Sequence, residues 1–359
     1  MTKNGRPIRI GVIGAGGIGS IHLQILGKLR GDCEVVAVSD MVLSQAEQRA
    51  KEYGVPVVPA DPEKLLAMPD VDAVVIAVPN KYHKEYTLAA LESGKHVLVE
   101  KPMGLNVEDA KEIVRAERKY GKVVMVGHQM RWDWVPMRIR EQIERGELGR
   151  IYSAKTGWFR RQGIPGWGSW FTRKNEAGGG PLIDIGVHMI DLAFFLLGEP
   201  KPVTVFGAVY AEFGPRKKGL GGWGVPDWNG YFDVEDFATA LIRMEDGRTL
   251  TLEVSWAAHV DSDSLPFVHL FGTEGGAVIR GETGKFLTER DGKPVDIPLV
   301  PPAEDEGNRV RLARHFLECI RTGRKPATSV ETGLRSNLII DGIYESSRTG
   351  REVVLDWNV

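Results

Sequence analysis

Short apolar runs and amphipathic segments alternate regularly through the first third of the chain. The runs are almost uniformly Val, Ile and Ala, as expected of strands that are buried on both faces. We predict strands at Ile8–Ile13, Val35–Ser39, Ala73–Val78, His96–Val99 and Val123–Val126. We predict helices between them at Ile18–Leu29, Ser44–Tyr53, Lys81–Leu91 and Val107–Arg118. This alternation predicts an α/β domain with a doubly wound parallel sheet.

Two of these helices have N-cap candidates. Asn106 directly precedes Val107–Arg118, and its side chain can accept a hydrogen bond from the first turn. Ser44 has Glu47 three residues further on, which is the spacing of a capping box. We therefore expect Asn106 and Ser44 to cap their helices.

The pattern changes after about residue 127, where strand-like runs follow one another with few helices between them. We predict strands at Tyr152–Arg160, Val203–Ala211, Phe237–Arg243, Thr249–Trp256, Val268–Gly272 and Ala277–Arg280. The hairpin turns are expected at Asp246-Gly247, Gly275-Gly276 and Asp291-Gly292. Helices are expected at Met137–Arg145, Val187–Leu197, Val310–Thr322 and Val330–Ser347. We therefore predict two domains, residues 1–127 with the parallel sheet and residues 128–359 with a large, mostly antiparallel sheet that has helices on one face.

Composition narrows the class of protein. With 359 residues, 42% hydrophobic and 26% charged, the chain suits two folded domains, and a formal charge of −2 gives no reason to expect a nucleic-acid or anionic-membrane partner. Cys33 and Cys319 form neither a disulfide framework nor a zinc spacing. Met1–Arg9 is polar, and the apolar run Met189–Leu197 is short and broken by Asp191. We expect a cytoplasmic protein that spans no membrane.

A glycine-rich turn joins the first predicted strand to the first predicted helix. Its residues are Gly14, Ala15, Gly16, Gly17, Ile18 and Gly19. Gly14 permits the tight turn, Gly16 lets a pyrophosphate approach backbone N–H groups, and Gly19 allows close helix–sheet packing. Asp40 ends the second strand, where a carboxylate accepts hydrogen bonds from ribose hydroxyls and repels a 2′-phosphate. These residues predict a dinucleotide site that prefers NAD over NADP; a glycine turn without a ligand is the alternative.

A second set of polar residues suggests chemistry on a hydroxyl group. Lys101 follows a predicted strand at the edge where ligands bind in doubly wound sheets, and Pro102 restricts its backbone. Asp184 and His188 are spaced four apart after a glycine-rich run, so they share one face of a helix. A histidine can accept a hydroxyl proton while a lysine polarises the same oxygen. A core histidine and a helix-capping aspartate are the alternatives; a zinc site of His188 and Asp191 lacks a third ligand, so we expect no metal.

Together these motifs resemble the Gfo/Idh/MocA family, named for glucose–fructose oxidoreductase, inositol dehydrogenase and a rhizopine-catabolism protein. The resemblance spans essentially the whole chain and rests on the glycine turn, Asp40, Glu100-Lys101-Pro102 and the segment from Gly178 to Asp191. It implies an N-terminal Rossmann domain and a C-terminal domain with an open, mostly antiparallel sheet that often builds dimers or tetramers. It also implies that Lys101, Asp184 and His188 are the catalytic set.

The resemblance implies further site residues. Pro79, Asn80 and His83 would line the nicotinamide side, Glu100 would belong to the cofactor site, and Arg131 would lie near the substrate. Aromatic and basic residues crowd the segment before Asp184 and could bind a sugar or pack an interface: Trp158, Arg160, Trp167, Trp170 and Phe171. Arginine would there hydrogen-bond hydroxyls or pair with a carboxylate.

Three functions fit these residues. The leading hypothesis is reversible NAD-dependent oxidation of a secondary hydroxyl on a sugar, sugar derivative or cyclitol. The second is an NAD-dependent glycoside hydrolase that acts by oxidation, elimination and re-reduction. The third is a non-catalytic dinucleotide- or sugar-binding regulator. The Gly/Trp-rich segment Pro215–Gly230 is expected to be a loop: an active-site lid, an oligomer contact or a mobile segment.

Overall fold

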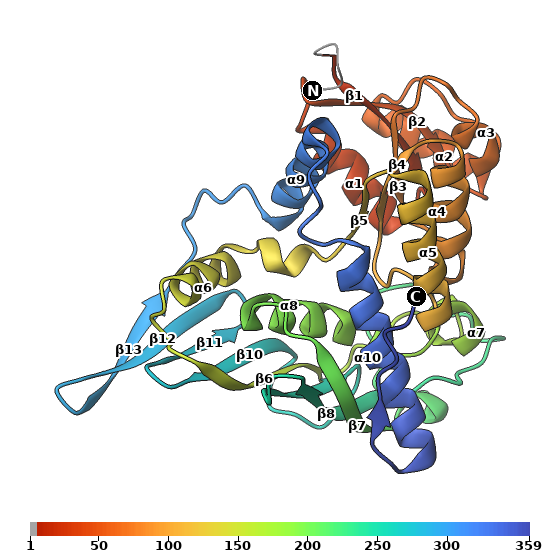
Figure 1. Cartoon of the computed structure of the whole chain (residues 1–359). Coiled ribbons are helices and arrows are strands. Elements are labelled where there is room, and N and C mark those ends of the chain that lie inside the picture. The colour runs from red at the N-terminus through yellow and green to blue at the C-terminus, as the bar shows by residue number, and fades with distance from the viewer. Residues whose placement is uncertain (1–5) are drawn as a thin grey trace. The chain divides into compact units, whose positions relative to one another are not determined.

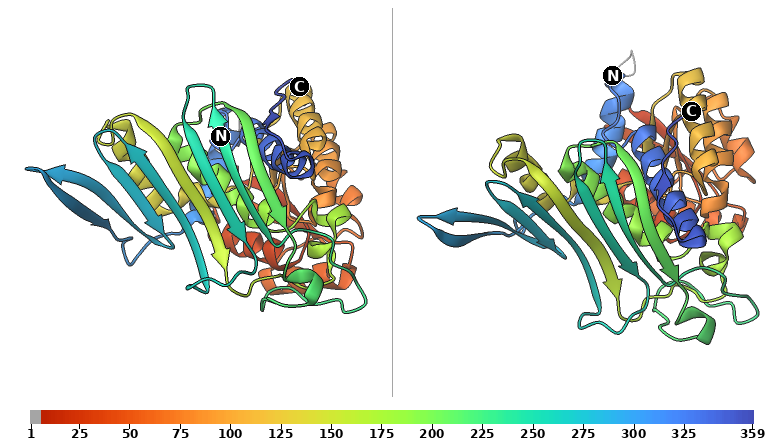
Figure 2. Two further views of the ribbon diagram at one scale, coloured as in Figure 1. Left: turned by 90° about the horizontal axis from the view of Figure 1, so that it is seen from below. Right: turned by 60° about the horizontal axis from the view of Figure 1, so that its bottom comes forward.

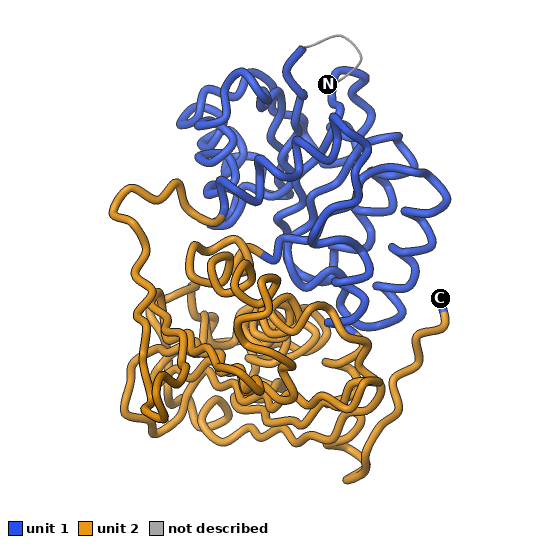
Figure 3. The backbone as a smooth tube through the Cα atoms, turned by 60° about the vertical axis from the view of Figure 1, so that its left-hand side comes forward, with its two compact units in different colours: residues 1–128, 309–337, 359 blue, residues 129–308, 338–358 orange. Residues whose placement is uncertain are grey.

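The computed structural model describes residues 6–359 (Figure 1). The chain divides into two compact units (Figure 3). Unit 1 holds the chain up to His128, together with Arg309–Asn337 and Val359. Unit 2 holds Gln129–Asn308 and Leu338–Asn358.

Unit 1 is built on a parallel sheet, as predicted. Within the described residues the sheet has five strands in the order β2-β1-β3-β4-β5. They are β1 (Ile8–Ile13), β2 (Cys33–Ser39), β3 (Ala73–Ile76), β4 (His96–Val99) and β5 (Val124–Val126). Ile76 on β3 pairs with both Ile13 on β1 and Val99 on β4, so the carboxyl ends of these three strands lie at one edge. The strand order reverses between β1 and β3, the position where such sheets bind ligands.

The helices of unit 1 largely follow the predicted pattern. They are α1 (Gly17–Gly27), α2 (Leu43–Tyr53), α3 (Pro62–Leu66), α4 (His83–Glu92) and α5 (Val107–Tyr120). Asn106 caps α5 as predicted, because its side chain accepts a hydrogen bond from the Asp109 amide. The predicted Ser44 cap is wrong: α2 begins one residue earlier, after Val42, without a side-chain cap.

The chain returns to unit 1 after β13 (Lys293–Leu299), before the last strand, β14 (Val353–Val354), joins the large sheet. Helix α9 (Asn308–Thr322) lies beside α1 (Figure 1), and Arg321 donates a hydrogen bond of 2.7 Å to Asp32. The Val126 amide on β5 donates to the carbonyl of Thr328 at 2.8 Å. The predicted second domain contained the whole of residues 128–359, whereas Arg309–Asn337 cluster with unit 1. The amphipathic pattern of α9 shows which face is buried, but not which sheet it is buried against.

Unit 2 is built on one large sheet. Within the described residues it has nine strands in the order β13-β12-β11-β10-β6-β9-β8-β7-β14, and only β6 and β9 pair in parallel. The strands are β6 (Ile151–Arg160), β7 (Pro202–Tyr210), β8 (Phe237–Met244), β9 (Thr249–Ser255), β10 (Ser264–Gly272), β11 (Gly276–Arg280), β12 (Thr283–Arg290), β13 (Lys293–Leu299) and β14 (Val353–Val354). The predicted mostly antiparallel sheet is confirmed.

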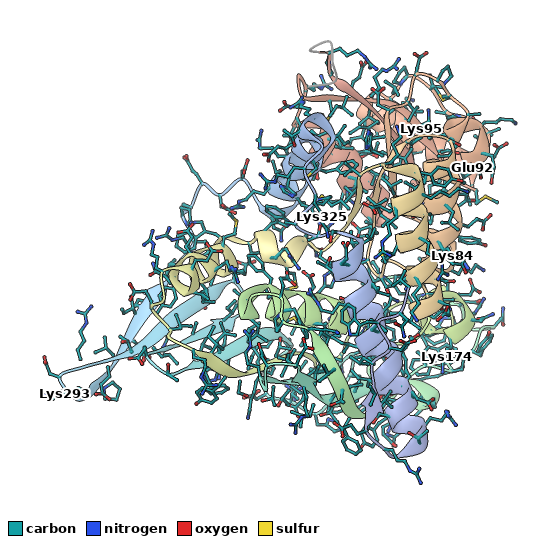
Figure 4. The ribbon with its side chains drawn as sticks, in the orientation of Figure 1. Lys84, Glu92, Lys95, Lys174, Lys293 and Lys325 are labelled. Carbon is teal, nitrogen blue, oxygen red and sulfur yellow. The ribbon has the colours of Figure 1, made fainter. Side chains whose placement is uncertain are left out.

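The β12–β13 hairpin was only partly predicted from the pattern of hydrophobic and polar residues. Its turn at Asp291-Gly292 was predicted, and both residues have positive φ, at 51° and 73°. The two strands were missed because their side chains are largely exposed and because prolines, which argue against a strand, interrupt the alternating Val295, Ile297 and Leu299. Lys293 lies at the tip of this hairpin (Figure 4).

Helices cover one face of the large sheet (Figures 1 and 2). They are α6 (Trp134–Glu144), α8 (Val187–Leu197) and the C-terminal part of α10 (Val330–Thr349). The segment Lys174–Leu197, which includes the short α7 (Lys174–Ala177), is long and apolar enough to cross a membrane, but 89% of its most apolar window is buried inside the protein. It forms the core of unit 2 together with Trp256 and Ile242. Cys33 and Cys319 are free and buried.

Candidate functional site

The glycine turn combines two crowded positions with two open ones. Gly14 has φ +99°, and a Cβ there would lie 2.3 Å from the Ala77 carbonyl oxygen. A Cβ on Gly19 would lie 1.9 Å from the Gly14 carbonyl oxygen. Gly16 and Gly17 have no such neighbour within 4 Å. Gly14 and Gly19 therefore close the turn, whereas Gly16 and Gly17 leave their backbone open to a ligand.

The start of α1 fits the pyrophosphate of a dinucleotide. No side chain caps the helix, and its first turn contains no acidic residue. The first N–H groups of a helix need acceptors, and a helix N-terminus favours negative charge. The residues from Gly16 to Ile18 therefore suit the cofactor predicted from the motif.

Asp40 is held directly against the glycine turn. One carboxylate oxygen accepts a hydrogen bond of 2.7 Å from the Ala15 amide, and the other accepts one of 2.8 Å from the Val42 amide. The carboxylate is therefore fixed at the end of β2, beside the turn, where ribose hydroxyls are bound in this fold. The side chain of Arg49 on α2 also reaches this turn, at 3.4 Å from the Ala15 carbonyl oxygen.

The predicted nicotinamide-side residues follow β3. Pro79 and Asn80 form the start of a 3₁₀ turn, Asn80–Tyr82. His83 is fully buried, with Nδ1 2.6 Å from the Pro102 carbonyl oxygen and Nε2 2.9 Å from that of Val78. Burial lowers the pKa of His83, against the opposing effect of these two carbonyls. The His83 ring therefore connects the segments that follow β3 and β4.

Glu100 forms a buried charged cluster directly before Lys101. Its carboxylate lies 2.7 Å from Nε2 of His22 on α1 and 3.4 Å from the Arg309 guanidinium, and it accepts a bond of 3.3 Å from the Lys101 amide. Burial acts to raise the pKa of Glu100, but His22, Arg309 and Lys101 outweigh it, so the pKa is lowered. Glu100 therefore holds the backbone of Lys101, whose peptide bond to Pro102 is cis. The resemblance implies a place in the cofactor site for Glu100, which stays a prediction beside these internal partners.

In unit 2, Asp184 lies on an unusual helical turn. Residues Leu182–Gly186 form a π-helix that leads directly into α8, so Asp184 and His188 lie about one turn apart. Such π turns are rare and are found frequently at functional sites. Asp184 accepts a hydrogen bond of 3.0 Å from Nε1 of Trp256, a fully buried residue after β9.

Glu235 holds the start of this turn. Its buried carboxylate accepts hydrogen bonds from the amides of Gly180 at 2.9 Å and Leu182 at 3.0 Å, and from the Tyr344 hydroxyl at 3.0 Å. Burial raises the pKa of Glu235, while these bonds act to lower it. A Cβ on Gly180 would lie 1.9 Å from the Glu235 carbonyl oxygen, which explains a glycine at this position.

Two residues at the end of β6, Trp158 and Arg160, lie close to His188 and Asp184. The Trp158 ring centroid lies 6.4 Å from that of buried His188, and the Arg160 guanidinium carbon lies 4.8 Å from the Trp158 ring. The pKa of Arg160 is lowered by burial, and the charge of Asp184 opposes this shift. Four neighbouring side chains of unit 2 are therefore grouped together, and we call this group the wall: Trp158, Arg160, Asp184 and His188.

The other predicted substrate residues lie in different surroundings. Arg131 is buried and donates hydrogen bonds to Asp191 and Glu199, which raise its pKa against the effect of burial. Trp167 is buried, donates to the Gly214 carbonyl at 2.8 Å and stacks on Trp228 of the Pro215–Gly230 loop. The structure thus gives Arg131 an internal ion pair and Trp167 a role in loop packing.

The remaining aromatic residues join this loop. Trp170 stacks on Phe171, and Phe171 meets Trp223 edge to face. The Pro215–Gly230 loop is also tied by backbone bonds, including that from the Gly166 amide to the Trp223 carbonyl at 2.9 Å.

Several residues that support the site were not predicted from the sequence. These residues are Trp256, Glu235, His22 and Arg309. Glu235 acts on amides 53 and 55 positions away, and Arg309 acts on a carboxylate 209 positions away. A single sequence contains no local signal for partners so distant.

Comparison with known proteins identifies the family. Residues 8–128 match the model described as oxidoreductase family, NAD-binding Rossmann fold, and residues 136–278 match the GFO/IDH/MocA C-terminal domain. The chain belongs to the Gfo/Idh/MocA family. The family predicted from the glycine turn and the Lys101, Asp184 and His188 motifs is therefore confirmed.

Several relatives of this chain are named as sugar or cyclitol dehydrogenases. A D-glucoside 3-dehydrogenase of Escherichia coli K12 is 34% identical over 97% of this chain and 98% of its own. A scyllo-inositol 2-dehydrogenase (NAD(+)) of Bacillus subtilis strain 168 is 28% identical over 97% of this chain and 96% of its own. A solved levoglucosan dehydrogenase in complex with NADH and levoglucosan has a TM-score of 0.88 and 24% identity, covering 98% of this chain and 100% of that one. The solved structure confirms the fold.

Proposed function

We propose that this Gfo/Idh/MocA protein is an NAD-dependent dehydrogenase that oxidises a secondary hydroxyl of a sugar, sugar derivative or cyclitol. The wall of Trp158, Arg160, Asp184 and His188 supports this proposal most directly, because it combines a proton acceptor, hydrogen-bonding charges and an aromatic face. The open glycine turn with Asp40 supports the cofactor. The named relatives support the substrate class.

The catalytic roles follow from the chemistry of the side chains. Lys101 donates a hydrogen bond to the reacting oxygen and stabilises its developing negative charge. His188 accepts the hydroxyl proton, and Asp184, fixed by Trp256, orients the substrate. The bound nicotinamide supplies the hydride acceptor.

The test is a spectrophotometric assay of NAD or NADP with cyclitols, hexoses, sugar acids and glycosides. We expect reduced nicotinamide with NAD and at least one sugar or cyclitol, and a loss of about 100-fold or more in Lys101→Ala and His188→Asn. Lys293→Ala, on the hairpin tip, is the matched control and keeps full turnover. Full activity of Lys101→Ala would refute the catalytic assignment. Free sugar released from glycosides without net reduced nicotinamide would instead favour the hydrolase.

We also propose that NAD is preferred over NADP and that the protein is a homodimer or homotetramer. Asp40 supports the first, because its fixed carboxylate repels a 2′-phosphate. The second is supported by the face of the large sheet that its helices leave open (Figure 2). The strands carry partly exposed aromatic residues on this face, among them Tyr210, Phe237 and Phe159. A cytoplasmic location stays a prediction.

A further inference from the structure

Arg160 differs from the other enclosed arginines of unit 2 in lacking an acidic partner. Arg131 pairs with Asp191 and Glu199, and Arg173 pairs with Asp227. Within residues 6–359, two groups act on the Arg160 guanidinium. It lies over the ring of Trp158, and the negative charge of Asp184 favours its charged form. It ends β6 in a half-buried position.

The donors of this guanidinium are open to a ligand. It carries five N–H donors, and none of its nitrogens is a buried atom without a hydrogen-bond partner, so the donors face the solvent side of a half-buried side chain. The fold holds the side chain in place. A Cβ on Gly163 would lie 2.5 Å from Cδ of Arg160, so the glycine leaves the space that the arginine fills. The position therefore holds an arginine whose donors a ligand can reach.

The neighbouring groups show which ligand chemistry fits. Asp184 is an acceptor with several lone pairs, and Arg160 is a donor, on the same wall. A hydroxyl group donates and accepts at once, so it can use both residues. A ligand carboxylate would pair with Arg160 but would be repelled by Asp184, and an ammonium would be repelled by Arg160. The ring face of Trp158 suits the C–H face of a sugar ring.

We propose that Arg160 is a specificity-determining residue that donates hydrogen bonds to a hydroxyl group next to the reacting carbon of a neutral sugar. The inference rests on the proposed function and deepens it, because it selects neutral polyols over sugar acids. Arg160 binds the unreacting hydroxyl together with Asp184, while His188 serves the reacting one. The enzyme then recognises a pair of neighbouring hydroxyls and not a single alcohol.

The experiment takes one glycoside that the wild type oxidises and compares it with its monodeoxy analogues and its uronic acid counterpart, in wild type and Arg160→Ala. On the parent, we expect Arg160→Ala to lower kcat/KM by about 10- to 100-fold, the range for a hydrogen bond to a charged group. One monodeoxy analogue should lose a similar factor with the wild type. On that analogue, Arg160→Ala should lower kcat/KM by less than about threefold, because the hydroxyl that Arg160 binds is already missing. The difference between this factor and the factor on the parent is the coupling that a double-mutant cycle measures. The uronic acid should react no faster than the parent.

Controls separate this role from a structural one. Arg161→Ala changes the neighbouring, exposed arginine and should leave all rates unchanged. Arg160→Ala should keep the wild-type Tm and affinity for NAD. An equal loss on every analogue would overturn the proposal, as would a uronic acid oxidised more than tenfold faster than the parent. If the wild type oxidises no sugar, the proposed function fails; calorimetry with the same sugars then decides whether Arg160 binds the hydroxyl.

Discussion

At the scale of single residues, Glu100 shows how a charge can be used to hold a neighbour. Its buried carboxylate meets His22 and Arg309, and its pKa is lowered in the folded protein. A carboxylate with a depressed pKa contributes stability above its unfolded pKa of about 4.3, and that contribution is lost as the pH falls. Glu100→Gln should lower the free energy of unfolding at pH 7 by about 3 kcal/mol. The difference from wild type should shrink below about pH 4.

Urea unfolding from pH 3 to pH 8 checks this expectation. Glu52→Gln, which changes an exposed carboxylate paired with Arg49, should leave the midpoint nearly unchanged at each pH. A Glu100→Gln deficit that stayed constant across the pH range would show that packing, and not charge, is the cause.

A second residue, Asp40, is expected to set the cofactor preference. Its carboxylate is fixed by the Ala15 and Val42 amides at the end of β2. Asp40→Ala should raise KM for NAD by about 10- to 100-fold, because a charged acceptor is lost. It should lower KM for NADP, because the repulsion of a 2′-phosphate is removed. Steady-state kinetics with both cofactors measure the two effects, with Glu47→Ala on the exposed side of α2 as control. A parallel rise in both KM values would contradict the repulsion argument.

At the scale of elements, the π turn before α8 is the part of the fold that most directly positions Asp184. Gly180→Ala would place a methyl group 1.9 Å from the Glu235 carbonyl oxygen, so the turn must shift. We expect a loss of about 1–3 kcal/mol in stability and a fall in kcat of at least about tenfold. Thermal unfolding and kcat are the measurements. Gly222→Ala, where a Cβ would meet nothing within 4 Å, should change neither. A destabilised variant with wild-type kcat would separate the turn from catalysis.

The same elements show how far sequence alone could go. The strands β1 to β4 were predictable because each is mostly apolar, and Asp184 and His188 could be proposed as a pair because they are close in sequence. The β12–β13 strands were not predicted, since their side chains are largely exposed and prolines interrupt β13. Glu235 and Arg309 are single charged residues whose partners are more than fifty positions away. Their importance depends on packing, which a single sequence does not encode locally.

At the scale of the whole molecule, the large sheet of unit 2 has one face that no helix of the described residues covers (Figure 2). Aromatic rings cross this face from strand to strand: Tyr210 meets Phe237 at 6.0 Å, Phe237 meets Phe159 at 6.0 Å, and Phe159 meets Phe267 at 6.3 Å. Beside them, Phe206 and Leu241 are opposite each other and are 52% and 43% exposed. Contiguous apolar surface of this kind marks interaction sites, and a sheet face is self-complementary in a two-fold dimer.

Leu241→Arg places a charge in the middle of this face, so it should dissociate the proposed oligomer. Sedimentation velocity at several protein concentrations should show a larger species for the wild type and the monomer for the variant. Val300→Arg, an equally apolar and more exposed position beyond β13, should keep the wild-type sedimentation coefficient. Circular dichroism of both variants should match the wild type, because Leu241 contributes little to the core. A wild type that sediments as a monomer would refute the oligomer. An oligomer that survives Leu241→Arg would place the interface elsewhere on the molecule.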